Sequence, residues 1–181
     1  LINEKLATNI VLVPYSTWQD AYNSTIAGKT NAIFGLSWSA ERESKYFIYS
    51  PTYHLTPNYL LVNKKNKDIY SYESLKGKKI AVESKTIFEN IIKEDAPLSD
   101  VFLVSSSIKG YESVSKNVTS AMLTGNLDEE LLSKYNLRIA SKVYNKLSKL
   151  FIGTNKNYPI VASIIKKGLN ALSLKEMQTL R

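Results

Sequence analysis

Apolar and polar positions along this chain follow two alternating patterns. Short apolar runs bounded by polar or glycine residues predict strands, and stretches with apolar residues every three or four positions predict helices. Strands are expected at residues 10–13, 31–34, 59–62, 80–82, 101–104, 119–123, 137–140 and 150–153. Because helical patterns fall between most of these runs, the chain has the β–α alternation that favours parallel sheets covered by helices.

Capping signals predict where the helices begin. A Ser, Thr or Asn followed three residues later by Glu or Gln is the pattern of a capping box. It occurs at Ser16/Gln19, Thr86/Glu89, Asn126/Glu129 and Ser173/Glu176. A long helix is expected to open at Asn157 with Pro159 in its first turn. Residues 1–7 have the pattern of the end of a helix, and further helices are expected over 108–114 and after Ser39.

Composition and length suit a globular protein. The 181 residues are 44% hydrophobic and 22% charged, which is enough for one domain or two small lobes with a shared core. There is no apolar run of the roughly 20 residues that a membrane-spanning helix needs. A signal peptide is also missing, so we expect a mature chain or an excised domain. The sequence has no cysteine, which excludes disulfides and thiolate metal sites.

The net charge of +8 raises the possibility of a nucleic-acid partner. The lysines are scattered, however, with only short clusters at residues 64–67 and 76–79. We therefore expect no nucleic-acid role. A positive field can instead attract anionic ligands or a membrane surface.

The stretch from Gly35 to Arg42 has the pattern of an anion-binding turn. It follows the predicted strand at 31–34, exposes hydroxyl groups, and has Ser39 placed to cap a helix that carries Arg42. The planar guanidinium of arginine suits a carboxylate. The alternative is that Arg42 pairs with Glu41 or Glu43 on a solvated surface.

These residues resemble extracellular solute-binding protein family 3, the amino-acid-binding type of periplasmic binding protein. The resemblance runs through residues 18–28, 32–37, Glu41-Arg42 and 49–53, and continues through residues 75–82 toward the C-terminus. The family pattern is a Trp that opens a helix, a Gly-x-x-Asp-Ala strand, a Ser/Thr-rich turn, Glu-Arg and Phe-Ser-x-Pro-Tyr. Here Asn31 replaces the Asp and Tyr49 the Phe.

The resemblance implies an α/β fold of the two-lobed periplasmic-binding-protein (type 2) kind, with a mainly parallel sheet in each lobe. Lobe 1 would comprise residues 1–63 and 153–181, and lobe 2 residues 67–148. The hinge crossovers would lie near 62–67 and 148–154, with ligand held in the cleft between the lobes. It also implies that the family's first strand and the loop after it are missing before Leu1, so lobe 1 would be incomplete.

The same resemblance assigns ligand-binding roles in lobe 1. Arg42 matches the arginine that grips a ligand carboxylate, Ser37 the hydroxyl beside it, and Gly35 the position where the backbone approaches the ligand. Trp38 either walls the cleft or packs beneath it.

In lobe 2, Ser84, Lys85 and Thr86 stand where the family has a Gly-Thr-rich turn at a helix start. Thr86 is either a ligand contact or only a helix cap, and Lys85 is either an anion contact or an exposed lysine. Thr124 and Asn126 stand where amino-acid binders carry an Asp for the ligand ammonium. This departure resembles the sensor versions of the domain found on histidine kinases and related receptors.

The resemblance therefore implies an extracytoplasmic binding or sensing domain for a carboxylate-bearing small solute. The partner would be a membrane-anchored parent receptor, and localisation would be periplasmic. The alternatives are a soluble subunit that delivers solute to an ABC permease, a cyclohexadienyl dehydratase-like enzyme, and a structural module whose site has decayed. No nucleophile–base set, placed acid or metal-ligand spacing is recognisable, so we expect no catalysis, no cofactor and no metal. The single histidine, His54, is expected to be a surface or packing residue.

Overall fold

The computed structural model describes residues 1–179. The contacts within the chain divide it into two compact units. Unit 1 comprises Leu1–Leu55 and Lys149–Arg181, and unit 2 comprises Thr56–Ser148. Two long strands, β3 (His54–Asn63) and β7 (Leu137–Asn155), cross the division and are neighbours in the sheet. The lobe boundaries and hinge positions given above stay predictions.

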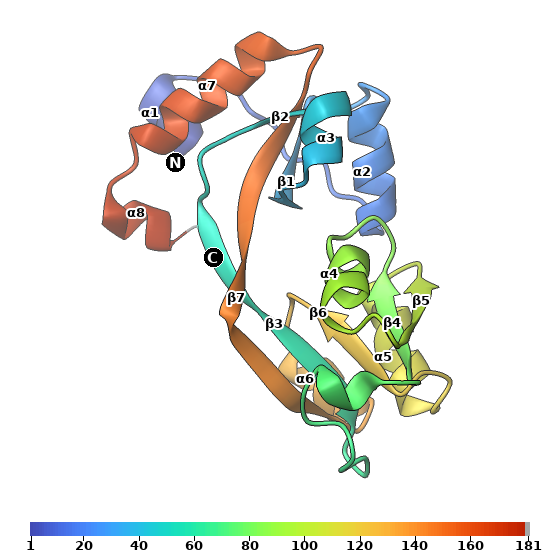
Figure 1. The fold of residues 1–181 in the computed structure, drawn as a ribbon. Helices are drawn as coiled ribbons and strands as arrows, with labels where there is room; N and C mark the ends of the chain where they lie inside the picture. The colour runs from blue at the N-terminus through green and yellow to red at the C-terminus, as the bar shows by residue number, and fades with distance from the viewer. Residues whose placement is uncertain (180–181) are drawn as a thin grey trace. The chain divides into compact units, whose positions relative to one another are not determined.

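Unit 1 is built on the C-terminal part of β7 (Figure 1). The strands β1 (Ala32–Ser37) and β2 (Phe47–Tyr49) both pair with it in antiparallel register. The helices are α1 (Ile2–Leu6), α2 (Trp18–Ile26), α3 (Ala40–Lys45), α7 (Pro159–Asn170) and α8 (Leu174–Gln178). Side chains from opposite faces of this small sheet reach different helices. Ile33 packs in a cluster with Tyr22 of α2, whereas Ile152 packs with Ile165 and Leu169 of α7.

Unit 2 holds the β–α alternation expected from the sequence. Its strands lie in the order β3-β6-β4-β5, with β4 (Lys79–Glu83) parallel to both β5 (Asp100–Val104) and β6 (Ala121–Thr124). β3 pairs with β6 in antiparallel register. The helices are α4 (Phe88–Asp95), α5 (Ser107–Ser115) and α6 (Glu129–Lys134), with a short 3-10 turn, η1, at Glu73–Leu75.

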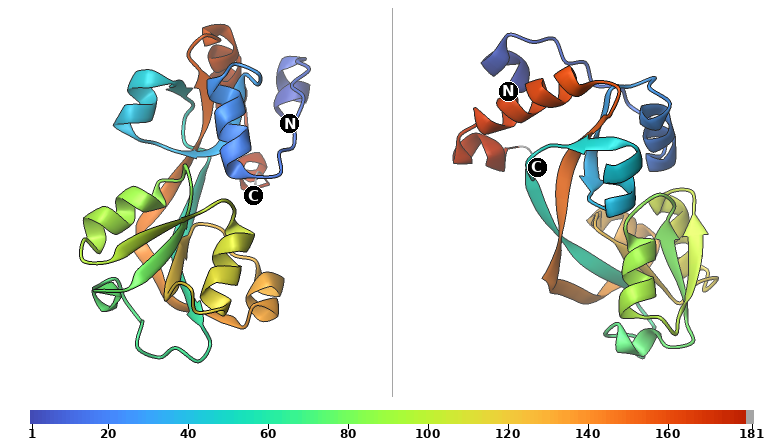
Figure 2. Two further views of the ribbon diagram at one scale, coloured as in Figure 1. Left: turned by 90° about the vertical axis from the view of Figure 1, so that its right-hand side faces the viewer. Right: turned by 45° about the horizontal axis from the view of Figure 1, so that its top comes forward.

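The core of unit 2 consists of two apolar clusters on opposite faces of its sheet. Alternate residues of β4 point to opposite faces, so Ile80 and Val82 join one cluster and Ala81 joins the other. The first cluster packs against Ile92 of α4, and the second against Tyr111 of α5. Figure 2 shows α4 and α5 on the two sides of the strands. Burial on both faces explains why these strands have continuous apolar runs.

The predicted α/β fold is confirmed, and so are most of the strands and helices of both units. The parallel pairing is found in unit 2, whereas the described pairs of unit 1 are antiparallel. The strand predicted at 10–13 is wrong, because residues 8–15 have no regular secondary structure. The two strands predicted at 137–140 and 150–153 form one strand, β7, because the backbone between them is also extended.

Three predicted caps are also wrong. Thr17, rather than Ser16, caps α2 by accepting a hydrogen bond from the Asp20 amide. The Thr86 hydroxyl donates back to the Glu83 carbonyl, and α4 begins without a side-chain cap. Asp128, rather than Asn126, caps α6. Ser, Thr and Asp two to three residues from a helix compete for the same amides, so small shifts in the turn change which residue caps.

Two other caps agree with the sequence. Ser39 caps α3, and Ser173 forms the expected capping box with Glu176. The helix expected to open at Asn157 begins at Pro159, with Tyr158 as its N-terminal flanking residue.

Candidate functional site

Unit 1 brings the predicted residues together at the C-terminal end of β1. The register between β1 and β7 shifts between Ile33 and Leu36, which marks a bulge. Gly35 lies in this bulge with a φ of 71°, a conformation that favours glycine. Its amide donates to the Tyr53 hydroxyl at 2.9 Å. The backbone at Gly35 is therefore held by a side chain rather than left open.

Arg42 is buried, with only 8% of its surface exposed. Its Nη1 donates to the Ser37 carbonyl at 2.9 Å, and its guanidinium carbon lies 5.2 Å from the centroid of the Tyr22 ring. Cation–π attraction favours this stacking. Glu41 pairs with Lys45, and Glu43 accepts from the Trp38 indole. Because Arg42 is buried, it does not lie on the solvated surface that the alternative requires.

Two tyrosines complete the surroundings of Arg42. The Tyr49 hydroxyl also donates to the Ser37 carbonyl, at 3.2 Å. Burial raises the pKa of Tyr49 to about 12, although the nearby Arg42 charge acts to lower it. Burial likewise raises the pKa of Tyr22, again opposed by Arg42. Both phenols are therefore neutral at ordinary pH and serve as polar, uncharged walls around the cation.

Trp38 differs from its neighbours, because it is 49% exposed. Its indole nitrogen donates to the Glu43 carboxylate at 2.9 Å. Both alternatives from the sequence, that Trp38 walls the cleft or packs beneath it, stay predictions.

In unit 2, the turn after β4 places Ser84, Lys85 and Thr86. The Ser84 hydroxyl and amide both donate to the Val104 carbonyl at 2.9 Å, and Thr86 bonds back to Glu83 at 2.7 Å. Lys85 has a φ of 62°, which is unusual for a residue with a side chain. The hydroxyls thus fix the turn itself, and Thr86 is not a helix cap.

Thr124 is the last residue of β6, and Asn126 lies in the turn that follows. Thr124 is buried, and its hydroxyl accepts a hydrogen bond from the Asn126 amide at 3.2 Å. A Cβ on Gly125 would lie 3.0 Å from the Phe88 ring, so this turn approaches the start of α4 closely. The two turns of unit 2 that the sequence singled out are therefore neighbours, and Phe88 joins them.

Sequence reasoning missed three aromatic residues that lie beside these turns: Tyr22, Tyr53 and Phe88. Tyr53 lies within the 49–53 stretch that carries the family resemblance, so that resemblance offered a signal for it. Tyr22 fits the apolar face of a helix, but nothing in the spacing of Tyr22 or Phe88 indicates that they lie beside Arg42 and Gly125. The ligand-binding assignments themselves remain predictions.

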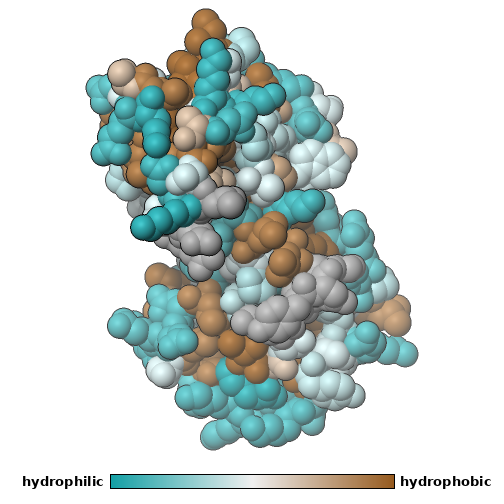
Figure 3. All heavy atoms as spheres, turned by 90° about the vertical axis from the view of Figure 1, so that its left-hand side faces the viewer, coloured by the Kyte–Doolittle hydropathy of each residue, from teal (hydrophilic) through white to brown (hydrophobic). Residues whose placement is uncertain are grey.

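Within residues 1–179, no group of three or more His, Asp or Glu residues is arranged to hold a metal ion. None of the helices described there is both long and apolar enough to cross a membrane. Figure 3 shows hydrophobic side chains in separate groups, with hydrophilic ones between them, over one face of the chain.

Comparison with known proteins identifies the fold. No protein-family model matches the chain, and a search of curated proteins finds no match. Solved structures do match. They include an ancestral arginine-binding protein bound to arginine, with 20% identity, a TM-score of 0.84, and coverage of 99% of this chain and 81% of that one.

Two sensor domains are also similar. The match to the periplasmic VFT2 domain of Bordetella pertussis BvgS covers 99% of this chain and 77% of that domain's chain, at 15% identity and a TM-score of 0.82. The match to a histidine kinase sensor domain with similarity to periplasmic binding proteins covers 99% of this chain and 80% of that chain, at 14% identity and a TM-score of 0.85. The chain therefore has the two-lobed α/β fold of periplasmic binding proteins and of sensor domains built on it.

Proposed function

We propose that this chain is an extracytoplasmic binding and sensing domain that recognises a carboxylate-bearing small solute. Its parent is a membrane-anchored signalling receptor such as a histidine kinase. The fold likeness supports a binding or sensor domain in general. The ligand class rests on unit 1, and the observation that carries it is the placement of Arg42.

Arg42 is a buried cation fixed from two sides, by the Ser37 carbonyl and by the Tyr22 ring. A guanidinium held in one orientation loses little conformational entropy when it binds a planar anion. Low local polarity strengthens its attraction for a negative charge. These properties favour a carboxylate over a neutral or cationic group, with Ser37, Gly35 and Trp38 as the neighbouring contacts in unit 1.

For unit 2 we propose Ser84, Lys85, Thr86, Thr124 and Asn126 as polar contacts. The Asn126 side chain offers an amide rather than a carboxylate. The next acid along the chain, Asp128, accepts from the Leu131 amide at the start of α6. An ammonium group would therefore meet a carbonyl oxygen instead of a full negative charge. This difference favours a carboxylate ligand without a strict need for an α-ammonium.

A soluble subunit of an ABC transporter is the second candidate. The arginine-binding protein and the histidine kinase sensor domain match this chain almost equally, with TM-scores of 0.84 and 0.85. The fold therefore favours neither. The full-length gene product distinguishes them, because a transmembrane segment and a kinase domain after residue 181 support the receptor. We propose no catalytic activity. The two neutral tyrosines beside Arg42 support binding of a ligand rather than acid–base chemistry.

Calorimetric titration tests the proposal with two matched pairs of ligands. L-Arginine is compared with agmatine, which lacks the carboxylate, and L-glutamine is compared with its decarboxylated amine. Binding of the acids and a loss of at least about tenfold for the amines is the expected result, since a charge-assisted contact contributes about 1.5–3 kcal/mol. Arg42→Lys should recover part of the affinity that Arg42→Ala removes. Equal binding of acid and amine would overturn the carboxylate assignment, as would unchanged affinity in folded Arg42→Ala.

A further inference from the structure

Unit 2 carries half of the net charge of the chain on one short segment. Residues 64–79 contain six lysines and two carboxylates, Asp68 and Glu73, so they hold four of the eight net positive charges. The six are Lys64, Lys65, Lys67, Lys76, Lys78 and Lys79. All of them are exposed, and among the described side chains none of them forms an ion pair. This charge is therefore open to an anionic partner.

The fold brings the two lysine clusters, 64–67 and 76–79, to the same end of the sheet. β6 lies between β3 and β4, and it runs antiparallel to β3 but parallel to β4. The end of β3 therefore lies near the start of β4, about 10 Å away across two strand spacings. Figure 1 shows the loop after β3 at the end of unit 2 from which the arrows of β4 and β5 point away. We call this surface the basic end and define it as residues 64–79, 97–100 and 116–120.

Large apolar side chains are exposed among these lysines. Tyr70, Leu98 and Val118 are 69%, 65% and 52% exposed, and all three lie in turns or bends. Tyr70 lies between the two lysine clusters along the chain, and the Leu98 carbonyl accepts from the Gly77 amide at 2.8 Å. Lysines beside exposed apolar side chains are typical of a surface that lies in a membrane interface, because charge attraction and apolar burial both contribute there.

A polar hollow of about 470 Å³ opens beside the basic end. It is lined by Lys65, Asp68, Ser115 and four asparagines: Asn63, Asn66, Asn117 and Asn136. The Asn66 side-chain oxygen accepts from the amides of Asp68 and Ile69, which leaves its NH₂ group as a donor. Asn117 directly precedes the exposed Val118. A hollow with amide and lysine donors next to an apolar side chain suits the polar headgroup of a phospholipid.

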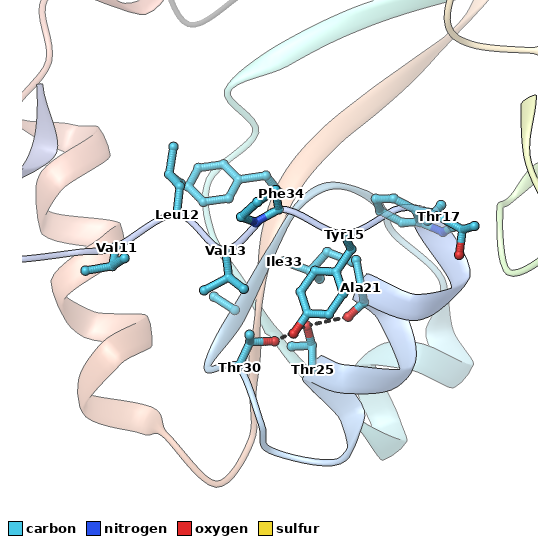
Figure 4. A pocket seen from close by; sticks show the side chains of 13 residues that line it. Val11, Leu12, Val13, Tyr15, Thr17, Ala21, Thr25, Thr30, Ile33 and Phe34 are labelled. Atoms are coloured by element: carbon cyan, nitrogen blue, oxygen red, sulfur yellow. Dashed lines mark hydrogen bonds between the residues drawn. The ribbon is translucent and has the colours of Figure 1, made fainter.

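The exposed apolar residues of unit 1 have different surroundings. Val11, Leu12 and Val13 line a hollow of about 650 Å³ with residues of α2 and β1 (Figure 4). The residues that line this hollow are all uncharged. Apolar exposure there has no positive charge to accompany it, so it does not favour an anionic surface as the basic end does.

We propose that the basic end of unit 2 docks on a phospholipid bilayer that contains anionic lipids. The lysines attract the lipid phosphates, and Tyr70, Leu98 and Val118 enter the region between headgroups and acyl chains. Lysine suits this position because its apolar stem lies among the headgroups while its ammonium group reaches a phosphate. The polar hollow takes up one headgroup.

The basic end is separate from the candidate ligand site. The turns 84–86 and 124–126 follow β4 and β6, whereas the basic end lies where these strands begin. The inference is therefore independent of the ligand proposed for Arg42, and either proposal can fail without the other.

The apolar side chains favour a bilayer over a soluble polyanion. A polyanion pairs with the lysines, but it offers no apolar region in which Leu98 and Val118 leave water. A second copy of this chain is a poorer partner, because each copy has a net charge of +8 and the two repel each other.

Co-sedimentation of residues 1–181 with lipid vesicles tests the proposal. One set of vesicles is phosphatidylcholine alone, and the other is an equimolar mixture of phosphatidylcholine and phosphatidylglycerol. We expect binding to the mixed vesicles that weakens as salt is added, and little binding to phosphatidylcholine. The triple variant Lys64→Gln, Lys65→Gln, Lys67→Gln should bind at least about tenfold more weakly, because each lysine near an anionic surface contributes about fivefold.

The matched control removes the same charge from exposed lysines of unit 1, with Lys29→Gln, Lys166→Gln and Lys167→Gln. This variant should keep most of the affinity for the mixed vesicles. An equal loss in the two triple variants would overturn the proposal, since binding would then follow net charge alone. Equal binding of the unmodified chain to the two kinds of vesicle would overturn it as well.

The double variant Leu98→Ser, Val118→Ser tests the apolar contacts. It should bind the mixed vesicles about tenfold more weakly, since both side chains leave water in the interface, and should bind soluble polyphosphate unchanged. Its control is Leu103→Ser, Ile108→Ser, at residues of the same unit that are 52% and 51% exposed. All four side chains are at least half exposed, so both variants should stay folded, which circular dichroism checks. Unchanged vesicle binding by the folded Leu98/Val118 variant would reject a bilayer in favour of a polyanion.

Discussion

The guanidinium of Arg42 stacks on the ring of Tyr22, with 5.2 Å between the guanidinium carbon and the ring centroid. Arg42 belongs to α3 and Tyr22 to α2, and the Arg42 bond to the Ser37 carbonyl adds the end of β1. One side chain therefore joins three elements of unit 1. Any ligand role for Arg42 is combined with a structural one.

Arg42→Ala is the first prediction. An arginine on a solvated surface would contribute little to stability. Arg42 is buried, and the substitution removes the hydrogen bond that its charged guanidinium donates to the Ser37 carbonyl. The carbonyl then has one hydrogen-bond donor fewer. The free energy of unfolding should fall by about 1–3 kcal/mol in urea denaturation.

The control for Arg42→Ala is Lys45→Ala on the same helix. Lys45 forms an exposed ion pair with Glu41, so its removal should destabilise the fold less than the removal of Arg42 does. Equal effects of the two substitutions would mean that Arg42 contributes no more than a surface charge.

A pair of substitutions at Tyr22 separates the ring from its hydroxyl. Tyr22→Phe keeps the aromatic face beneath Arg42, whereas Tyr22→Leu removes it. The cation–π interaction contributes about 0.5–2 kcal/mol, so the leucine variant should be less stable than the phenylalanine variant by at least that amount. Thermal and urea unfolding measure the difference. Two variants of the same stability would exclude a contribution from stacking.

Some of these relationships could be predicted from sequence and others could not. Ser39 caps α3 as expected because a cap depends on residues within one turn. The strand predicted at 10–13 has the right composition, but a strand needs a neighbour, and no described segment pairs with it. Composition indicates which residues can form a strand; it does not indicate whether a partner is present.

The alkaline stability of unit 1 should depend on Tyr49. Its pKa is about 12 in the folded state against 10.0 for the ordinary phenol, because burial disfavours the charged form. Because the pKa is raised by folding, the contribution of the neutral Tyr49 phenol to stability is fully present below pH 10. This contribution is lost as the pH rises toward 12. Tyr49→Phe should therefore flatten the decline of unfolding free energy over this range.

Denaturation at a series of alkaline pH values measures this effect, with Tyr70→Phe as the control, since Tyr70 is 69% exposed. An equally steep decline in the Tyr49→Phe variant would contradict the assignment of the raised pKa to Tyr49.

Gly110→Ala should destabilise unit 2. Gly110 lies on α5, and a Cβ there would lie 2.5 Å from the sulfur of Met122 on β6. The extra methyl group must displace a fully buried side chain, which costs about 1–3 kcal/mol. Met122→Ala provides the space, so the double variant should lose less stability than the sum of the two single variants. Additive losses would show that the two positions do not compete for the same volume.

The candidate site shows the same limit of sequence reasoning. Arg42 and Ser37 are five residues apart and were predicted together from the turn between them. Tyr22 and Arg42 are twenty residues apart on different helices, and only the packing of α2 and α3 around β1 places them in contact. Helical spacing fits any core aromatic residue, so it does not indicate a contact between Tyr22 and Arg42.

Nitrogen-detected NMR of the three arginine guanidinium groups tests the central claim most directly. Arg42 and Arg138 lie in different units, and Arg138 donates to the backbone carbonyl of Asn66 in unit 2. On titration with L-arginine of natural isotopic abundance, the Arg42 Nε–H resonance should shift and saturate with the calorimetric affinity. Agmatine should leave it unchanged, and Arg138 should serve as the unaffected reference. Saturable binding of the amino acid with no change at Arg42 would contradict the account.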